Sequence, residues 1–270
     1  MPFLDHLTLG QYVPLNSFVH SLDPRCKILG TMALITSVFL ANASPWPYLV
    51  WSALVVFLCI LSGLSLKNVL ASTRPALLLV LFTVIVNMFF AEGEELIRIS
   101  FISITREGLL TGIKMGLRLY FLIIFANMTM MTTSPLELSD GIESLLSPFR
   151  RFGVPAHEFA MMMTIALRFI PTLLEETDRI MKAQLARGAD LDSGGIAKRL
   201  KAFIPVLVPL FVIVFQRADE LAVAMEARCY RGGIGRSRMK PLHWASRDSF
   251  SLVVVSMICI GGVVLDRWIS

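Results

Sequence analysis

Five apolar runs divide the chain, and each is close to the length that crosses a lipid bilayer. A transmembrane helix needs about 20 mostly apolar residues, within a range of roughly 17–25. The runs extend from Ile28 to Ala43, Tyr48 to Leu64, Ala76 to Ala91, Gly108 to Thr132 and Phe250 to Leu265. We therefore predict an all-α polytopic membrane protein with about five transmembrane helices.

The composition agrees with this prediction. Hydrophobic residues make up 55% of the chain and charged residues only 17%, whereas soluble domains carry roughly 25% charged residues. A net charge of +5 in a soluble protein could indicate nucleic-acid binding, but the lysines and arginines here lie mainly between the apolar runs. The four cysteines and four histidines are dispersed, so we expect neither a disulfide framework nor a metal site.

The distribution of basic residues predicts the orientation, because positively charged flanks stay in the cytoplasm. The loop at 66–75 contains Lys67 and Arg74 without an acid, whereas residues 92–106 hold three glutamates against two arginines. Most of the remaining basic residues lie between 134 and 248. We expect the N-terminus and residues 134–248 in the cytoplasm and the C-terminus outside.

This pattern defines three regions. Residues 1–133 form an N-terminal membrane region with four spans, residues 134–248 a cytoplasmic or interfacial region of long helices, and residues 249–270 a C-terminal transmembrane helix. The middle region contains two apolar stretches, 160–174 and 203–215, which would raise the number of spans to seven if they cross the membrane. We favour long helices that begin in the membrane or its interface and project into the cytoplasm.

The middle region repeats one pattern. A helix is predicted from Pro155 to about Ala186 and another from about Ile196 to Arg228, each with an apolar first half and a charged second half. The acids Glu175 and Asp178 stand four residues before Arg179 and Lys182, the spacing of helical ion pairs. Small residues near both ends let helices cross closely, so we predict a crossed pair.

Both predicted helices end in Ala-Arg, as Ala186-Arg187-Gly188 and Ala227-Arg228-Cys229. Either arginine alone could simply complement the helix dipole. A planar guanidinium can also hold a partner's carboxylate through two hydrogen bonds, and the repetition favours this second interpretation. Glycine suits the position after a helix C-cap, so Cys229 should weaken the cap geometry at Arg228.

Other motifs change the picture little. No phosphate-binding loop of the G-x-x-x-x-G-K-[ST] form is present, so we expect this chain not to hydrolyse ATP itself. Gly108, Gly112 and Gly116 form a small face at which a neighbouring helix can approach closely, either within the subunit, which we favour, or from a partner. Lys114 and Arg118 in the same run either extend to the membrane interface, which we favour, or line an ion pathway.

These features resemble the transmembrane T component (EcfT) of energy-coupling factor transporters, ABC-type importers of vitamins and metal ions. The resemblance depends on Leu22-Asp-Pro-Arg-Cys-Lys27 before the first span, the Ala-Arg-Gly motif at 186–188, Met225-Glu-Ala-Arg228, and the spans around a long helical tract. It implies a non-catalytic subunit of the bacterial cell membrane that binds no cofactor itself. It also implies that Arg187 and Arg228 each dock on one of two cytoplasmic ATPase subunits, which hydrolyse ATP-Mg.

In that family the two helices that end in the arginine motifs are called coupling helices. The resemblance further implies a separate substrate-binding membrane subunit, the S component, which these coupling helices would contact. Candidate contact residues are Met161, Met162 and Met163, because methionine adapts to different partners. Val206 and Leu210, from the apolar stretch of the second helix, are further candidates. Alternatively, these residues face lipid or other helices. A self-contained permease or ion transporter is the main alternative function, but the predicted spans are poor in acids.

Overall fold

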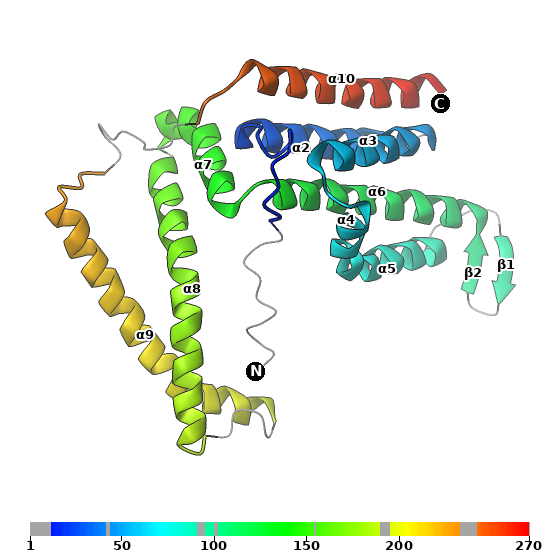
Figure 1. Ribbon diagram of the computed structural model, residues 1–270. Helices are drawn as coiled ribbons and strands as arrows, with labels where there is room; N and C mark the ends of the chain where they lie inside the picture. The colour runs from blue at the N-terminus through cyan, green and yellow to red at the C-terminus, as the bar shows by residue number, and fades with distance from the viewer. Residues whose placement is uncertain are drawn as a thin grey trace. The chain divides into compact units, whose positions relative to one another are not determined.

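The chain folds into helices and one small hairpin (Figure 1). A computed structural model describes residues 12–41, 44–90, 95–99, 102–153, 155–189, 195–232 and 242–269. It has two compact units. The bundle unit contains described residues 12–145 and 242–269, and the helix-pair unit contains described residues 146–232.

The bundle unit contains helices at all five predicted apolar runs. Its elements are α2 (Pro24–Leu40), α3 (Trp46–Ser62), α4 (Leu66–Ser72), α5 (Arg74–Phe90), β1 (Glu95–Ile99), β2 (Ile102–Thr105), α6 (Arg106–Thr132), α7 (Pro135–Leu146, whose last residue belongs to the other unit) and α10 (Ser246–Ile269). In this unit, α6 and α10 have the length and apolarity of a membrane span, and α3 and α4 do so together as a pair bent by 115°. Helices α2 and α5 are shorter, with 17 residues each, so their crossing stays a prediction.

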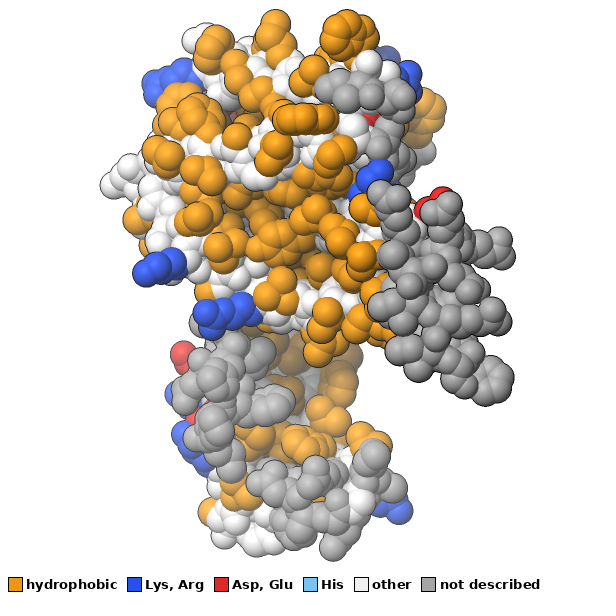
Figure 2. All heavy atoms as spheres, turned by 90° about the vertical axis from the view of Figure 1, so that its right-hand side faces the viewer, with side chains coloured by type: hydrophobic (Ala, Val, Ile, Leu, Met, Phe, Trp, Pro, Cys, Tyr) orange, Lys and Arg blue, Asp and Glu red, His pale blue; other side chains and the backbone are white. Residues whose placement is uncertain are grey.

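Apolar side chains of these helices also point outward. Leu78 of α5, Ile60 of α3 and Phe250 of α10 are 76%, 73% and 69% exposed, and Figure 2 shows hydrophobic side chains gathered over much of the unit's visible face. An apolar surface of this extent is unfavourable in water but suits contact with lipid tails. The surface agrees with the predicted class, an all-α polytopic membrane protein.

The segment predicted as an outer loop, residues 92–106, contains a hairpin that the sequence analysis did not predict. Strands β1 and β2 pair antiparallel, with Ile97 opposite Ile104 and Ile99 opposite Ile102. Isoleucine is frequent in strands because its branched side chain packs well on a pleated surface. The apolar β-branched residues between the glutamates and Arg106 therefore favour pairing over an open loop.

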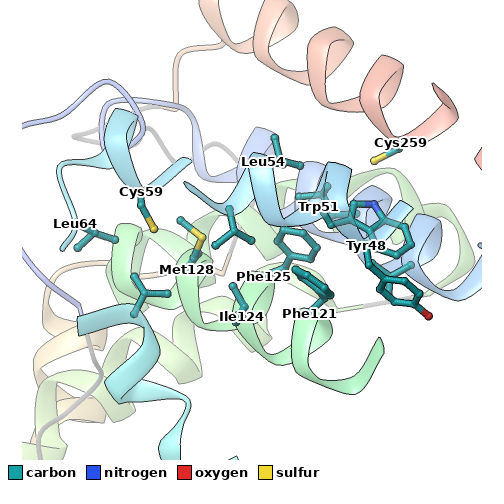
Figure 3. Close-up of a cluster of buried hydrophobic side chains, with 14 of the residues drawn as sticks. Tyr48, Trp51, Leu54, Cys59, Leu64, Phe121, Ile124, Phe125, Met128 and Cys259 are labelled. Atoms are coloured by element: carbon teal, nitrogen blue, oxygen red, sulfur yellow. The ribbon is translucent and has the colours of Figure 1, made fainter. Parts of the chain in front are cut away.

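Aromatic side chains from α3 and α6 form the centre of the bundle unit (Figure 3). Trp51 is fully buried and meets the ring of Tyr48 edge-on, with their centroids 5.3 Å apart. Phe121 and Phe125 of α6 stack at 6.2 Å, and Cys259 brings α10 into the same cluster. Phe121 also meets Trp51 across the two helices, with their centroids 6.1 Å apart, and such aromatic pairs stabilise a core beyond the area they bury. Because α2 and α4 contribute Leu34, Val38 and Val69 as well, the cluster joins five helices.

The glycine face of α6 packs against α5. A Cβ atom at Gly112 would lie 2.9 Å from the backbone oxygen of Val84, and one at Gly116 would lie 2.5 Å from the Cγ2 atom of Val84. Real Cβ atoms do not approach other atoms so closely, so only glycine allows this packing. The favoured interpretation of the small face, a contact within the subunit, is confirmed for these two glycines.

A buried polar network at the start of α2 joins three helices. The Asp23 backbone N–H donates to the Asp248 carboxylate of α10 at 2.9 Å, and the Cys26 thiol donates to the Asp248 backbone oxygen at 3.3 Å. Lys27 Nζ donates to the carbonyl oxygens of His20 and Thr132 at 3.1 and 2.9 Å. Thr132 ends α6, where carbonyls lack helical partners and a cation is favoured. The Leu22–Lys27 motif thus fixes the start of α2 to the end of α6 and the start of α10.

The helix-pair unit contains η1 (Ser147–Phe152), α8 (Ala156–Ala186) and α9 (Ile196–Ala227). Its boundaries differ from the predicted middle region of 134–248, because α7 and residues 242–248 belong to the bundle unit. Helix α7 packs there because Gly141 brings it against α2, where a Cβ atom would lie 3.0 Å from Ile28 and 3.2 Å from Pro24.

Candidate functional site: two arginine-bearing helix ends

Helix α8 ends in a complete Schellman motif around the first predicted arginine. Arg187 is the C-cap, and Gly188 follows in the left-handed conformation with φ of 83°. The Gly188 N–H donates to the Leu185 oxygen and the Ala189 N–H to the Gln184 oxygen, both at 3.0 Å. These two bonds satisfy carbonyls that the helix leaves free and fix the chain reversal. The Arg187 side chain therefore leaves a rigid helix end.

Helix α9 ends in the same motif although a cysteine replaces the glycine. Arg228 is the C-cap, and Cys229 has φ of 55°, the only positive φ of a non-glycine among the described residues. The Cys229 N–H donates to the Glu226 oxygen at 2.9 Å and the Tyr230 N–H to the Met225 oxygen at 3.0 Å. The expectation that Cys229 weakens this cap was wrong, since both bonds form and the cysteine accepts the left-handed conformation at a cost of about 1–2 kcal/mol.

Both motifs are exposed. Residues Ala186, Arg187 and Gly188, and residues Ala227, Arg228 and Cys229, are all exposed in the structure. Neither guanidinium forms an ion pair with another described residue, whereas Arg179, earlier on α8, pairs with Glu176. Because their charges are not neutralised within the described chain, Arg187 and Arg228 are available to a partner's carboxylates.

The two helices run antiparallel, which separates the arginines. Gln184 at the end of α8 donates to the Pro205 oxygen of α9 at 3.4 Å, and the Tyr230 hydroxyl donates to the Met161 sulfur near the start of α8 at 2.8 Å. Arg187 and Arg228 therefore lie at opposite ends of the pair. Since α9 has 32 residues, at about 1.5 Å per residue the two ends are on the order of 40 Å apart.

The predicted crossing of the helices is confirmed. Figure 1 shows α9 passing behind α8 and bending in its first half, the half that contains Pro205 and Pro209. A proline inside a helix removes a backbone hydrogen bond and commonly bends the axis. The crossing and the bend let the remainder of α9 diverge from α8.

An apolar cavity of about 350 Å³ lies between the diverging helices. Its lining comes from both helices: Ile165, Phe169, Leu173, Val214, Arg217, Ala218, Leu221, Ala222 and Met225. Arg217 at its edge pairs with Glu176 across the two helices at 3.9 Å, and Glu176 also pairs with Arg179 at 3.5 Å. The predicted Asp178–Lys182 pair forms, but Arg179 takes Glu176 in place of Glu175, so this part of α8 is connected to α9.

The candidate S-component residues differ in their exposure. Met162 and Met163 are 55% and 52% exposed, and Met161 is half-buried against Tyr230. Leu210 is half-buried as well. Val206 is only 2% exposed, so it offers little surface to a partner in this conformation, and its contact with the S component stays a prediction.

The remaining polar residues give no second site. Among the described residues, no three His, Cys, Asp or Glu side chains gather closely enough to hold a metal ion. Arg118 lies over the Phe39 ring, 5.7 Å from its centroid, a cation–π contact that stabilises an arginine in apolar surroundings. Asp266, expected after the last span, is buried within α10 and accepts hydrogen bonds from the backbone and side chain of Ser44.

The sequence analysis missed Tyr230 and the role of Glu176. Tyr230 occupies the position after the left-handed residue, where an apolar contact with the helix often accompanies a Schellman motif. That rule marks the position, but the contact of Tyr230 with Met161 of α8 is not indicated by any local pattern. The pairing of Glu176 with Arg217 joins residues 41 positions apart on different helices, and no local pattern indicates it.

Comparison with known proteins places this chain in a defined family. The profile of the CbiQ family, described as cobalt transport protein, matches residues 15–241. Energy-coupling factor transporter transmembrane proteins EcfT are similar over nearly the whole chain. The protein from Thermanaerovibrio acidaminovorans is 55% identical over 99% of both chains, that from Acidaminococcus fermentans 53% over 98% of both, and that from Thermosediminibacter oceani 49% over 96% of this chain and 97% of its own. This membrane protein therefore belongs to the CbiQ family of transport proteins, and within it to the transmembrane EcfT components of energy-coupling factor transporters.

Proposed function

We propose that this chain transmits the ATP-driven movement of two cytoplasmic ATPase subunits to a separate substrate-binding S component. The observation that carries the proposal is the matched pair of exposed helix ends, in which Arg187 and Arg228 have the same cap geometry. Each guanidinium would bind carboxylates on one ATPase subunit. The chain itself would hydrolyse no ATP and bind no cofactor, because its contribution is mechanical.

The antiparallel arrangement supports two partners over one. A single acidic groove could not hold two arginines that stand on the order of 40 Å apart, whereas two subunits side by side could each take one. When such subunits close and open, the ends of α8 and α9 would be drawn together or apart. The connections between the helices, including the Glu176–Arg217 pair, would then transmit a pull on either end to the whole pair.

The S component would bind the apolar part of the helix pair. Met162 and Met163 remain the best candidates from the sequence because both are exposed. The cavity between α8 and α9 adds an apolar concave surface whose width depends on the angle between the helices. A movement of the arginine ends would therefore change the surface presented to the S component. In this arrangement the N-terminus and both arginine ends lie in the cytoplasm and the C-terminus lies outside.

The test is a pair of arginine substitutions in the assembled transporter. Truncating one partner of a close charge pair at an interface costs about 2–5 kcal/mol, or at least roughly 30-fold in affinity. We expect the Arg187→Ala/Arg228→Ala variant to lose substrate uptake and co-purification of the ATPase subunits, and each single variant to lose one contact. Arg179→Ala is the matched control, because it removes an exposed arginine from α8 eight residues before the end.

The lysine variants separate charge from geometry. Arg187→Lys/Arg228→Lys keeps both charges but loses the planar fork, so we expect it to restore assembly only partly. Normal uptake and ATPase activity in the double alanine variant would refute the coupling role of the arginines. Equal losses in Arg179→Ala would show that general charge, and not these two ends, is responsible.

A further inference from the structure

A pair of exposed phenylalanines stands at the start of the helix-pair unit. In η1, Phe152 is 83% exposed and Phe149 is 51% exposed, and their ring centroids are 6.3 Å apart. The side chains of Ser147, Pro148, Arg151 and Gly153 are exposed too. Two neighbouring aromatic rings without a covering partner are unfavourable in water, so their surroundings in the working protein should be apolar.

The charged residues of this segment of the sequence, apart from histidine, have one sign. Arg150 and Arg151 stand between the two phenylalanines, and the chain contains no Asp or Glu between Glu143 and Glu158. A segment with adjacent aromatic and basic residues matches the boundary between lipid headgroups and tails, where rings insert below the phosphates and arginines pair with them. The basic residues fit an anionic surface specifically.

The position along the chain restricts the segment to the neighbourhood of the bilayer. Helix α6, which has the length and apolarity of a span, ends at Thr132, and only the 12-residue helix α7 lies between it and η1. At about 1.5 Å per residue, α7 is roughly 18 Å long. Ser147 therefore cannot lie far from the membrane surface at which α6 ends.

We propose that Phe149, Arg150, Arg151 and Phe152 form an interfacial anchor that binds anionic phospholipid headgroups where the helix-pair unit begins. The two rings would enter the boundary of the headgroups and acyl chains, and the arginines would bind lipid phosphates. The anchor would hold the start of α8 at the membrane surface. It goes beyond the coupling function proposed above and does not depend on it, because lipid binding requires no ATPase subunit.

The depth of a spin label at position 152 tests the anchor. Cys26, Cys59 and Cys259 are buried, so in the full chain with Cys229→Ser and Phe152→Cys a nitroxide reagent should react at position 152. In vesicles that contain phosphatidylglycerol, we expect the label to collide more with oxygen than with a water-soluble nickel chelate. Labels at Glu175→Cys, on the charged half of α8, and Met257→Cys, on the exposed apolar face of α10, provide the aqueous and lipid references.

Charge is tested in two ways, one of which needs no further substitution. Each basic residue near an anionic surface strengthens binding about fivefold, so the two arginines together should contribute roughly 25-fold. In vesicles of phosphatidylcholine alone, the ratio of membrane-bound to free segments should therefore fall by roughly 25-fold, and the label should become more accessible to the nickel chelate. Arg150→Gln/Arg151→Gln should cause the same shift in anionic vesicles, whereas Arg179→Gln should not. A label as accessible to the nickel chelate as the one at position 175 would overturn the proposal. A label shielded from both reagents would also overturn it, since it would indicate a protein contact.

Discussion

Replacing Asp248 tests whether the network at the start of α2 holds the bundle unit together. The Asp248 carboxylate is 3% exposed and accepts hydrogen bonds from the backbone N–H groups of Asp23 at 2.9 Å and Ala245 at 2.8 Å. Each hydrogen bond to a charged group contributes about 1.5–3 kcal/mol. Only the bond from Asp23 joins α2 to α10, because Ala245 directly precedes α10. Asp248→Ala should therefore weaken the contact between the two helices by about 1.5–3 kcal/mol, and Asp248→Asn, whose remaining oxygen can still accept from Asp23, should weaken it less.

Cys26 provides the assay, because it is protected by the same network. The thiol donates to the Asp248 backbone oxygen, and burial, followed by the negative charge of Asp248, raises the pKa of Cys26 to about 11. A maleimide at pH 7.5 should react only when α10 separates from α2. A loss of about 1.5–3 kcal/mol increases that opening by about 10- to 100-fold, so Asp248→Ala should react faster by about this factor, as measured by mass spectrometry of the peptide.

Two comparisons make the result specific. Both Asp248 variants remove the charge beside the thiol, so the difference between them reports the lost hydrogen bond and not the change in the pKa of Cys26. Exposed Cys229 should react at the same rate in every variant. Labelling of Cys26 in Asp248→Ala that is no faster than in the wild-type chain would refute the assigned role of the network.

Three further predictions concern local geometry. Gly116→Ala should lower the free energy of unfolding by about 1–3 kcal/mol through overpacking. A second substitution, Val84→Ala, should restore the stability of this variant, because the added methyl group clashes with the Val84 side chain. It should not restore Gly112→Ala, in which the clash is with the Val84 backbone oxygen. Cys229→Gly should stabilise the chain by about 1 kcal/mol in denaturant titrations, because glycine adopts positive φ without strain. Burial, reinforced by Lys27, lowers the pKa of His20 below its ordinary 6.5. The stability contributed by neutral His20 is therefore fully present above about pH 6.5 and is lost as the pH falls from there through the lowered pKa of the folded state. His20→Gln should remove this part of the pH dependence of thermal unfolding.

Each of these has a contradicting outcome. Equal rescue of both glycine variants by the smaller residue at position 84 would show that the two contacts are not distinct. A less stable Cys229→Gly variant would mean that the cysteine side chain contributes more than its backbone strain costs. An unchanged pH profile in His20→Gln would place the acid sensitivity in another group.

The helices of this chain could be predicted from its sequence because their signals are local. Pro155 and the Ala-Arg ends predicted the bounds of α8 and α9 to within one residue, since proline and glycine act on their own turn of backbone. The Schellman hydrogen bond of the Tyr230 N–H, by contrast, depends on whether Cys229 accepts a positive φ. Residue preferences favour glycine at that position, so the sequence did not predict the bond. The pairing of Val84 with Gly112, of Asp23 with Asp248 and of Glu176 with Arg217 depends on how separate helices pack, and no periodicity along one helix determines it.

The number of membrane spans could likewise not be predicted from local sequence signals alone. Length and hydropathy identify α6, α10 and the 200–227 part of α9 as long enough to cross a membrane, although α9 was predicted to project into the cytoplasm. A helix face that contacts lipid and a helix face that binds a partner helix have the same apolar composition. Whether lipid or a partner subunit contacts the apolar residues of α9 is therefore decided by the assembled transporter and not by the local sequence.

The native thiol of Cys229 offers the most direct measurement of the coupling role. It is exposed and directly follows Arg228, so a short photo-crosslinker attached there in the intact transporter samples the partner of that helix end. The account predicts an adduct with a cytoplasmic nucleotide-hydrolysing subunit, and a second adduct, with the other such subunit, when the reagent is placed at Ala186→Cys. Adducts formed only with a membrane subunit, or a Cys229 that reacts with impermeant reagents from outside the cell, would contradict it.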